Sequence, residues 1–325
     1  MCSVQQLCFL AFAASAAAGA SLVGQCDSEL SDSAALLQTN IAGRPEAVEN
    51  DHGPAEEDSA LASKMQWDDQ HCACTTVFLA AVLDTGTNAV HHKDHSMGGF
   101  SFFQRYYESI IALPGGRAKA VIVHNRLPEN LTRAKSNSAV SFTKVDISGM
   151  HEHMTVVEWR WIVLFDQVRK HPEWDTLFMT DISDVVVHHN PCVFVQKHPG
   201  KLFASSEQNK GFGGWVLHSF FRQLGGKYLA WYGDHRASLP AKLLNAGVFG
   251  GHRADVLRFA VHMEAVLLDP ELAVKMDATT HWFDPGAFNY ALRAKFALSD
   301  VVSGYPLHSM FWKYESRKDV YIKHK

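Results

Sequence analysis

The sequence predicts a single α/β domain in which a mixed sheet is flanked by helices. From Cys72 onward, apolar runs rich in β-forming residues alternate with amphipathic helical stretches, which is typical of a sheet covered by helices. The 325-residue chain is 47% hydrophobic and 20% charged, an ordinary composition for a globular domain. In addition, an apolar run leads directly into two aspartates, Asp181 and Asp184.

The first part of the domain predicts three strands and one helix. The apolar run TTVFLAAVL at 75–83 is typical of a buried strand, and KAVIVHN at 119–125 and VSFTKVDI at 140–147 are the next two strands. Between them we expect a helix from about Phe100 to Leu113, which ends at Pro114-Gly115-Gly116. Its apolar face consists of Phe103, Tyr106, Tyr107 and Ile110.

The second part continues the alternation. Thr155-x-x-Glu158 resembles a capping box and opens a long helix that ends before His171-Pro172. The stretch LFMTDISDVVVHHNP at 177–191 contains a strand, two carboxylates and a second apolar run. KLLNAGVFGG at 242–251 predicts a strand that ends in glycines, and ADVLRFAVHMEAVLLD at 254–269 predicts a helix.

The region before the domain predicts a targeting segment and a stem. Residues 7–24 are uncharged and apolar, so we expect 1–26 to be a signal peptide or a signal anchor, both of which remain open. Residues 27–70 hold eleven acidic and two basic side chains without a sustained period, which predicts a disordered acidic stem. The domain then occupies 71–325. A targeting segment predicts the secretory pathway: the Golgi or ER lumen, or secretion.

The charge excludes one class of function. A net charge of -4 gives no basic surface of the kind that nucleic-acid binding needs. Without the stem, residues 71–325 carry 23 acidic and 28 basic side chains, a balance that suits an anionic ligand such as a nucleotide diphosphate.

Two features fit an oxidising compartment. Cys192 can pair with Cys72 or with Cys74, and the sequence leaves both open. The sequon Asn130-Leu131-Thr132 fits a glycosylated surface loop of a secreted protein.

Asp181 and Asp184 are the main candidates for chemistry. Two carboxylates just past an apolar strand lie where open α/β sheets bind ligands, and carboxylate oxygens suit hard divalent cations. The alternative is that they are turn and capping residues between strands.

Four segments together resemble the nucleotide-diphospho-sugar transferases, that is, glycosyltransferases of the GT-A type. HPEWDTLFMTDISDVVVHHNP resembles the segment that carries their DxD motif, LLNAGVFGG their Asn-(Ser/Ala)-Gly strand, and DPGAFNYAL the start of their Asp-Gln-x-x-x-Asn helix. The C-terminal HSMFWKYESRKDVYIKHK is similar to their closing segment. The resemblance covers roughly 72–325 and implies a Rossmann-type mixed sheet. Two departures are that two residues separate the aspartates and that Pro285 replaces the usual Gln.

The resemblance implies a metal site. Asp184 would be a direct ligand and Asp181 a ribose or second-shell partner, or the reverse. A late His, here His324, would complete the coordination of Mn²⁺ or Mg²⁺, and Lys325 would meet the donor's phosphate. The alternative for the last two residues is a solvated tail, but the apolar side chains before them predict that the C-terminus folds back over the sheet.

Further residues are implied in the donor site, each with an alternative. Asn245 and Gly247 would bring the backbone close to the sugar, or simply end a strand. Asp284 would bind donor hydroxyls and, with Asn245, is a candidate catalytic residue, or it caps the helix of Pro285. Arg160 points to the donor or to solvent.

The sequence therefore predicts a metal-dependent glycosyltransferase that moves a sugar from a nucleotide donor to a hydroxyl group of a glycan, glycoprotein or other acceptor. The relatives it resembles imply retention of configuration. An alternative function is a non-catalytic member that binds a glycan or nucleotide-sugar. A remote alternative, an aspartic protease, depends on VLDTGTN at 82–88, but no second D-S/T-G loop follows.

Overall fold

The computed structural model describes residues 74–84, 99–151, 154–206, 213–239, 243–273, 283–308 and 319–324, except for the side chains of 213–217 and 219. All of them belong to one compact unit within Ala60–Lys325. The predicted signal segment and acidic stem lie outside these residues, so the domain boundaries stay predictions. Within the described ranges, no helix combines the length and the apolar character that crossing a membrane requires.

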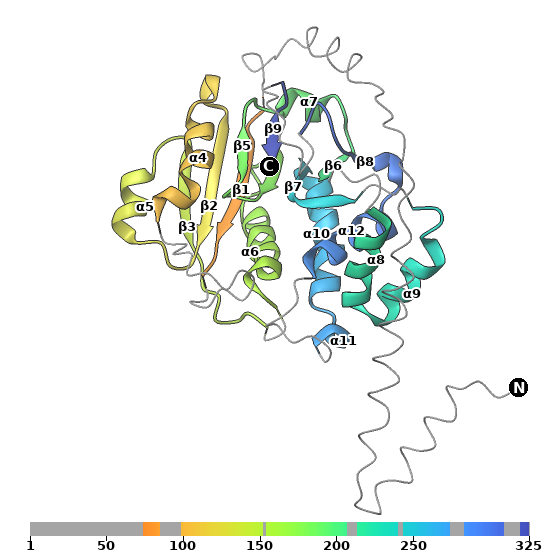
Figure 1. Ribbon diagram of the computed structural model, residues 1–325. Helices are drawn as coiled ribbons and strands as arrows, with labels where there is room; N and C mark the ends of the chain where they lie inside the picture. Colours follow the sequence, from red (N-terminus) through yellow and green to blue (C-terminus); the bar gives the residue numbers. More distant parts are fainter. Residues whose placement is uncertain are drawn as a thin grey trace, which may run out of the picture. The chain divides into compact units, whose positions relative to one another are not determined.

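A mixed seven-stranded sheet forms the centre of the described part of the chain, with the strand order β3-β2-β1-β4-β7-β6-β8 (Figure 1). β1, β2, β3 and β4 run parallel, whereas β7 is antiparallel to both β4 and β6, and β8 is parallel to β6. The bounds are β1 Thr76–Val82, β2 Ala118–His124, β3 Val140–Lys144, β4 Thr176–Thr180, β6 Leu202–Ser206, β7 Leu244–His252 and β8 Val301–Val302.

A second, two-stranded sheet pairs β5, Val185–Val187, with β9, Ile322–His324, in antiparallel orientation. Nine α-helices and two short 3₁₀ turns complete the described elements. They are α4 Phe100–Ile111, α5 Glu129–Lys135, α6 Val156–Lys170, α7 Cys192–Gln196, α8 Gly213–Leu224, α9 Gly226–His235, α10 Arg253–Leu267, α11 Pro270–Ala273, α12 Asp284–Lys295, η2 Pro114–Gly116 and η3 Leu298–Asp300.

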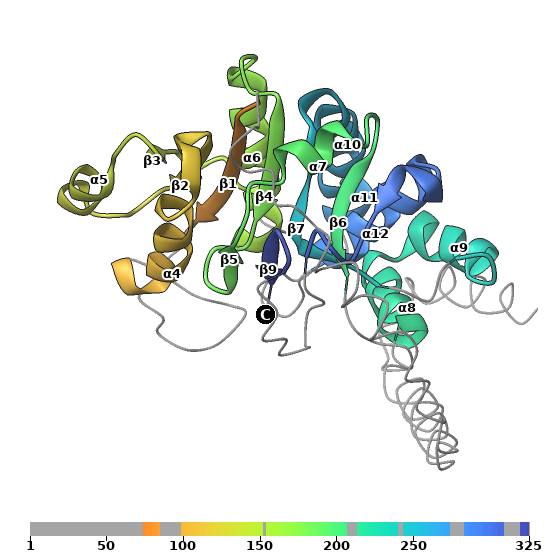
Figure 2. The same cartoon turned by 90° about the horizontal axis from the view of Figure 1, so that it is seen from above.

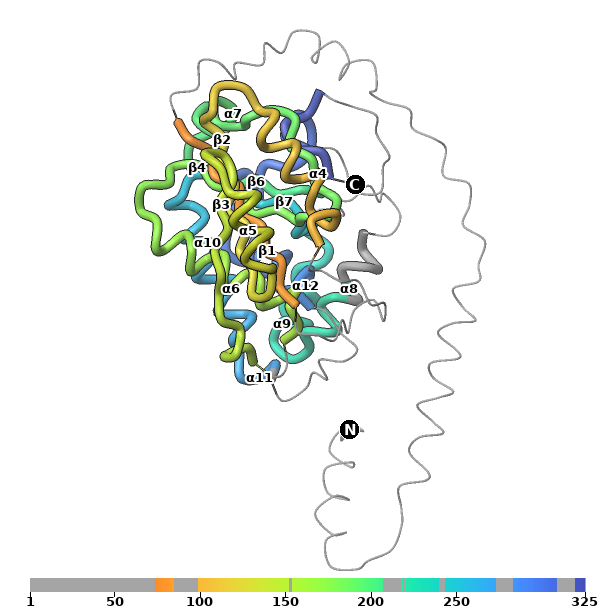
Figure 3. The backbone as a smooth tube through the Cα atoms, turned by 90° about the vertical axis from the view of Figure 1, so that its left-hand side faces the viewer, coloured from red at the N-terminus to blue at the C-terminus, as the bar shows by residue number. Residues whose placement is uncertain are grey.

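The large sheet is covered on both faces (Figure 2). α6, α10 and α12 pack on one face, and α4 packs with β5 and β9 on the other. In Figure 3 the blue C-terminal segment lies on the same side of the sheet as α4. This arrangement confirms the predicted α/β class with a mixed sheet flanked by helices.

Most predicted elements appear with boundaries shifted by a few residues. The helix predicted at 100–113 ends at Ile111, and the capping box of Thr155 and Glu158 opens α6 as expected. The strand predicted at 140–147 ends already at Lys144, because the Asp146 carboxylate accepts the backbone N–H of Ser148 and forms a turn. The helices α5, α7, α8, α9 and α11 and the strands β6 and β8 were not predicted.

The sequence predicted that the strand around Asn245 ends at its glycines, but the strand continues beyond them. Gly250 and Gly251 lie inside β7, which continues to His252. A Cβ at Gly250 would lie 2.6 Å from Cδ1 of Phe178 on the neighbouring β4. The glycine is therefore needed for close packing between strands rather than for a turn.

A disulfide joins Cys74 to Cys192, which resolves the choice between Cys72 and Cys74 for the described residues. It links the chain just before β1 to the first residue of α7, with 6.2 Å between the two Cα atoms. Next to it, the Thr76 hydroxyl donates to Oδ1 of Asn190 over 2.6 Å. The bridge thus holds the segment that follows β5 against the large sheet.

We expect removal of this disulfide to destabilise the domain without changing its fold. The two cysteines are 118 residues apart, and a crosslink over a long loop restricts the unfolded chain, which typically contributes about 2 to 4 kcal/mol. Urea unfolding of the double variant Cys74→Ala/Cys192→Ala measures this loss. Reduced wild-type protein should behave like the variant, and equal stability of oxidised wild type and variant would contradict the expectation.

A second prediction concerns pH and His124 at the end of β2. Burial, aided by the charge of Lys144, lowers the pKa of His124, and its Nδ1 accepts the Leu127 N–H over 3.2 Å, which requires a neutral ring. A folded-state pKa below the unfolded value means that stability is full above pH 6.5 and is lost as the pH falls. We therefore expect the free energy of unfolding to decrease towards pH 5.

The variant His124→Asn provides the matched control, because an amide oxygen can accept the same N–H at every pH. Chemical unfolding of both proteins between pH 7.5 and 5 should show a steeper decline for the wild type. Parallel curves would show that protonation of His124 does not contribute.

Candidate metal centre

Three predicted side chains converge at the carboxyl end of the central strand β4: Asp181, Asp184 and His324. One possible ligand atom from each lies within 4.8 Å of the others. Nε2 of His324 is 3.6 Å from Oδ2 of Asp181 and 3.9 Å from Oδ1 of Asp184. The expected return of the C-terminus to these two aspartates is thus present in the structure, and their role as metal ligands stays a prediction.

Strand pairing brings the three residues together. Asp181 follows β4 directly, and its backbone N–H donates to the carbonyl of Gly247 over 2.8 Å. Asp184 directly precedes β5, and Val185 pairs with His324 of β9. β9 is buried through Ile322, and Leu307, Val320 and Tyr321 are buried next to it. Of the apolar residues expected to anchor the tail, Met310, Phe311, Trp312 and Tyr314 lie outside the described residues.

Gly247 forms the floor of this group. A Cβ at this position would lie 2.7 Å from Oδ2 of Asp181 and would also overlap the ring of His324. Only glycine lets the imidazole and the carboxylate approach the strand this closely. The backbone of Gly247 therefore lies against the candidate metal group, and its approach to a donor sugar stays a prediction.

The donor set fits a divalent cation. Two carboxylates suit Mg²⁺ and Mn²⁺, and an imidazole beside them favours a transition metal over Mg²⁺. The His324 side chain is 1% exposed, whereas those of Asp181 and Asp184 are 28% and 16% exposed. The imidazole is thus enclosed by the protein, whereas the two carboxylates are partly open to solvent.

Arg160 connects this group to a third carboxylate. Its Nη1 pairs with Oδ1 of Asp181, and its Nη2 lies 3.0 Å from Oδ2 of Asp284. Asp284 also accepts from Nε1 of Trp161 over 3.5 Å. The side chain of Arg160 is only 20% exposed, which contradicts the solvent alternative, whereas its contact with a donor stays a prediction.

Burial and the neighbouring charges together shift the pKa values of Asp181 and Asp284 in opposite directions. Burial raises the pKa of Asp181, but Arg160 and His324 together lower it well below its usual range. Burial raises the pKa of Asp284 to about 7 against the effect of Arg160, and the negative charges of Glu158 and Asp181 add to that rise. The pKa of Arg160 is raised above its ordinary value by the two aspartates, although burial lowers it.

Asp284 does not cap its own helix. The N-cap of α12 is Phe283, and it makes no side-chain cap hydrogen bond. Asp284 is the first residue of the helix and is 2% exposed, and its carboxylate is directed at Arg160. The capping alternative considered for Asp284 is therefore wrong, because the side chain is used between helices.

Asn245 is engaged within the sheet. Its Oδ1 accepts the backbone N–H of Gly247 over 2.7 Å, and its carbonyl accepts the Ser205 hydroxyl over 2.8 Å. The pairing of β6 with β7 shifts register next to Ser205. Asn245 thus shapes the strand that carries Gly247, and its catalytic role stays a prediction. Lys325 lies outside the described residues.

Sequence reasoning missed the wider role of Glu158. It was recognised as half of a capping box, but it is completely buried and also accepts backbone N–H groups of Phe283 and Asp284. No local signal indicates this second role, because the partners are 125 and 126 residues away.

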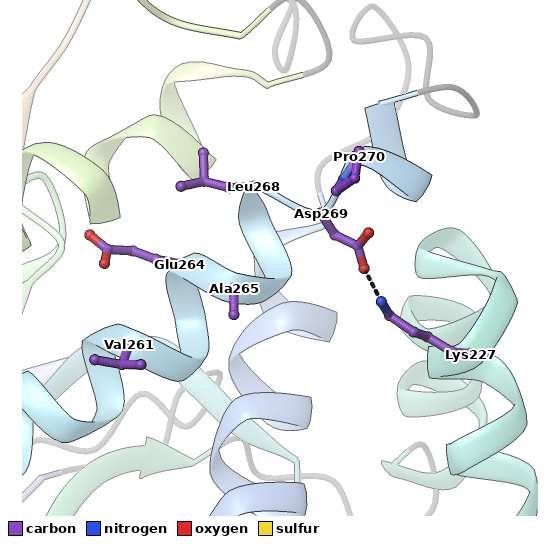
Figure 4. Close-up of a pocket in the computed structure, with 7 residues that line it drawn as sticks. All are labelled: Lys227, Val261, Glu264, Ala265, Leu268, Asp269 and Pro270. Carbon is purple, nitrogen blue, oxygen red and sulfur yellow. Dashed lines mark ion pairs between the residues drawn. The ribbon is translucent and has the colours of Figure 1, made fainter.

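A surface hollow of about 410 Å³ lies elsewhere, between α9, α10 and α11 (Figure 4). In it, Lys227 pairs with Asp269 over 2.6 Å. Asp269 is also occupied by the Tyr228 hydroxyl and by the Glu271 N–H. The hollow shares no residue with the metal group, and its most buried acid, Asp269, already accepts from three donors. Its lining consists of Lys227, Val261, Glu264, Ala265, Leu268, Asp269 and Pro270.

No family model matches the sequence, and no curated protein matches it. Among solved structures, the chain is similar to the galactosyltransferase LgtC in complex with donor and acceptor sugar analogues, with 13% identity, a TM-score of 0.45, and coverage of 76% of this chain and 86% of that one. A similarity at this level does not bear on function, so the functional assignment depends on the site.

We expect the variant Gly247→Ala to weaken divalent-metal binding while the domain stays folded. The added Cβ displaces His324 and Asp181, and a displaced ligand shell typically lowers metal affinity about 10- to 100-fold. Electron paramagnetic resonance of free Mn²⁺ during titration measures the affinity. Gly233→Ala in α9 is the matched control, because its Cβ meets open space. Equal Mn²⁺ affinity in both variants would contradict the proposed geometry.

Proposed function

We propose that this protein is a metal-dependent glycosyltransferase that moves a sugar from a nucleotide-diphosphate donor to a hydroxyl acceptor. The observation that supports this most is the convergence of Asp181, Asp184 and His324 beside the ion-paired Arg160 and Asp284. This group lies at the carboxyl end of β4, which is where open α/β sheets bind their ligands.

The two aspartates have different surroundings. One oxygen of Asp181 is held by Arg160 and the other faces His324. Asp184 presents Oδ1 towards His324, 3.9 Å from its Nε2. Because Arg160 already holds one oxygen of Asp181, we assign Asp184 as the principal metal ligand and Asp181 as the residue that links the metal site to Arg160 and the ribose.

Mn²⁺ is the proposed cofactor. A bound divalent cation would neutralise the donor diphosphate and stabilise it as the leaving group. His324 and the two aspartates would hold the cation, and Lys325 would place an ammonium group near the phosphate.

Asp284 and Arg160 would form the sugar side of the site. The Asp284 carboxylate is buried at the start of α12 and is oriented by Arg160 and Trp161, so it can accept hydrogen bonds from donor hydroxyls without reorganising. Asn245 would hold the Gly247 strand in the shape that the sugar requires. Retention of configuration, and a glycan or glycoprotein as acceptor, follow from the sequence resemblance and remain part of the proposal.

We also propose that the protein enters the secretory pathway, with the segment before the stem cleaved or kept as an anchor. The disulfide between Cys74 and Cys192 fits an oxidising lumen. Asn130 of the sequon is exposed in the first turn of the short helix α5, where a glycosylating enzyme can reach it.

A donor-hydrolysis screen tests the function. We expect the purified protein to release nucleoside diphosphate from one nucleotide-sugar in the presence of Mn²⁺, and to stop when the metal is chelated. Asp184→Asn keeps the side-chain shape and removes one charge, so activity should fall at least about 100-fold, the loss expected when several kcal/mol of charge stabilisation are removed.

The unfolding transition of Asp184→Asn should stay close to that of the wild type, because Asp184 lies at the rim of the core. Full Mn²⁺-dependent activity in this variant would disprove the ligand assignment. Tight binding of a nucleotide-sugar by the wild type without turnover, over the whole screen, would favour the non-catalytic alternative.

A further inference from the structure

Glu158 is a completely buried carboxylate that joins two helices next to the proposed active site. It lies in the first turn of α6, and its exposed fraction is 0%. A buried carboxylate is stable only if its oxygens receive hydrogen bonds or an opposite charge. The described contacts of Glu158 supply hydrogen bonds from neutral groups alone.

The two oxygens of Glu158 serve different helices. Oε2 accepts the Thr155 N–H over 2.9 Å and also the Thr155 hydroxyl, which closes the capping box of α6. Oε1 accepts the N–H groups of Phe283 and Asp284 over 2.8 and 3.3 Å. One side chain therefore caps its own helix and, at the same time, the first turn of α12.

This second capping supplies something that α12 lacks. The first N–H groups of a helix have no partner within the helix, and its N-terminus carries a partial positive charge. The N-cap residue of α12 is Phe283, whose apolar side chain cannot accept hydrogen bonds from these N–H groups. The carboxylate of Glu158 satisfies two of these donors and is favoured there by the helix dipole.

The same contact sets the position of Asp284. Its backbone N–H is held by Glu158 of α6, and its carboxylate meets Arg160, two residues further along α6. α12 therefore meets α6 through the backbone at one point and through an ion pair at the next. Arg160 in turn pairs with Asp181.

We propose that Glu158 is a positioning residue for the active site, which fixes the first turn of α12 so that Asp284 holds Arg160 in register with the metal-binding aspartates. This inference depends on the proposed function for its catalytic consequence, but its structural consequence can be tested separately. In this proposal Glu158 acts through Asp284 and is not itself one of the groups that bind donor or metal.

The first experiment measures geometry without catalysis. In Glu158→Gln, an NH₂ group, which can only donate, replaces one oxygen. The side chain can then no longer accept the donors of α12 and the capping-box donors together. We expect the amides of Phe283 and Asp284 to lose protection against hydrogen exchange by about tenfold or more. Unchanged protection of these amides would overturn the proposal.

Thr155→Ala is the matched control for capping alone. It removes the hydroxyl from the capping box of α6 but leaves both bonds from α12 to Glu158. We expect it to lower the melting temperature while the exchange of the Phe283 and Asp284 amides stays as in the wild type. If Thr155→Ala exposes these amides as much as Glu158→Gln does, helix capping explains the effect and the positioning role fails.

The second experiment is a double-mutant cycle between Glu158→Gln and Asp284→Asn, read out as Mn²⁺ affinity and as the rate of diphosphate release. A residue that acts through Asp284 should add little once Asp284 has been changed. We expect each single variant to lower at least one readout about 10- to 100-fold, and the double variant to resemble Asp284→Asn. If the fold losses of the two single variants multiply in the double variant, the proposal is overturned.

The two proposals fail in distinguishable ways. If the wild type neither binds Mn²⁺ nor turns over any donor, the proposed function fails, while the exchange of the Phe283 and Asp284 amides still decides whether Glu158 positions α12. If Glu158→Gln does not fold, Glu158→Asp replaces it in both experiments, since it keeps the charge but is one methylene too short to reach both helices. The expected and contradicting results are the same.

Discussion

The antiparallel pairing of β5 with β9 is the constraint on which the candidate site depends. β9 is held by its ladder with β5 and by the backbone N–H groups of His188 and His189, which donate to the Tyr321 carbonyl over 2.8 and 3.2 Å. Ordering a chain end costs conformational entropy. Burial of Ile322 and of the neighbouring Val320 and Tyr321 offsets this cost, at about 1.5 to 3 kcal/mol for a large apolar side chain. His324 is therefore placed by packing.

The charges around the site follow from the same arrangement. Asp181, Asp184, Asp284 and Glu158 gather four carboxyl groups within one chain of contacts, and Arg160 is the guanidinium that pairs with two of them. Burial of several like charges is relieved either by protonation or by a cation. The pKa of Asp284, raised to about 7 chiefly by its burial, is the first kind of response. A divalent cation between Asp181, Asp184 and His324 would be the second.

The sequence predicted those parts that depend on local patterns. An apolar run followed by Asp181 marked the end of β4, the Thr155 and Glu158 spacing marked the start of α6, and the apolar tail indicated the return of His324. What it could not show depends on contacts between distant residues: the second role of Glu158 and the pairing of Arg160 with both Asp181 and Asp284. α8 and α9 pack on other helices rather than on the sheet, and no strand-helix alternation announces them.

Two residues separate Asp181 from Asp184, one more than in a DxD motif, and yet the two carboxylates converge. Asp181 still pairs with the backbone of β7, whereas Asp184 already belongs to the start of β5 in the small sheet. Ile182 is 5% exposed and anchors the turn in the core beneath α4, and Ser183 is exposed at its outside. The two intervening residues therefore connect the large sheet to the small one, one facing the core and one facing outward, and both carboxylates still reach His324.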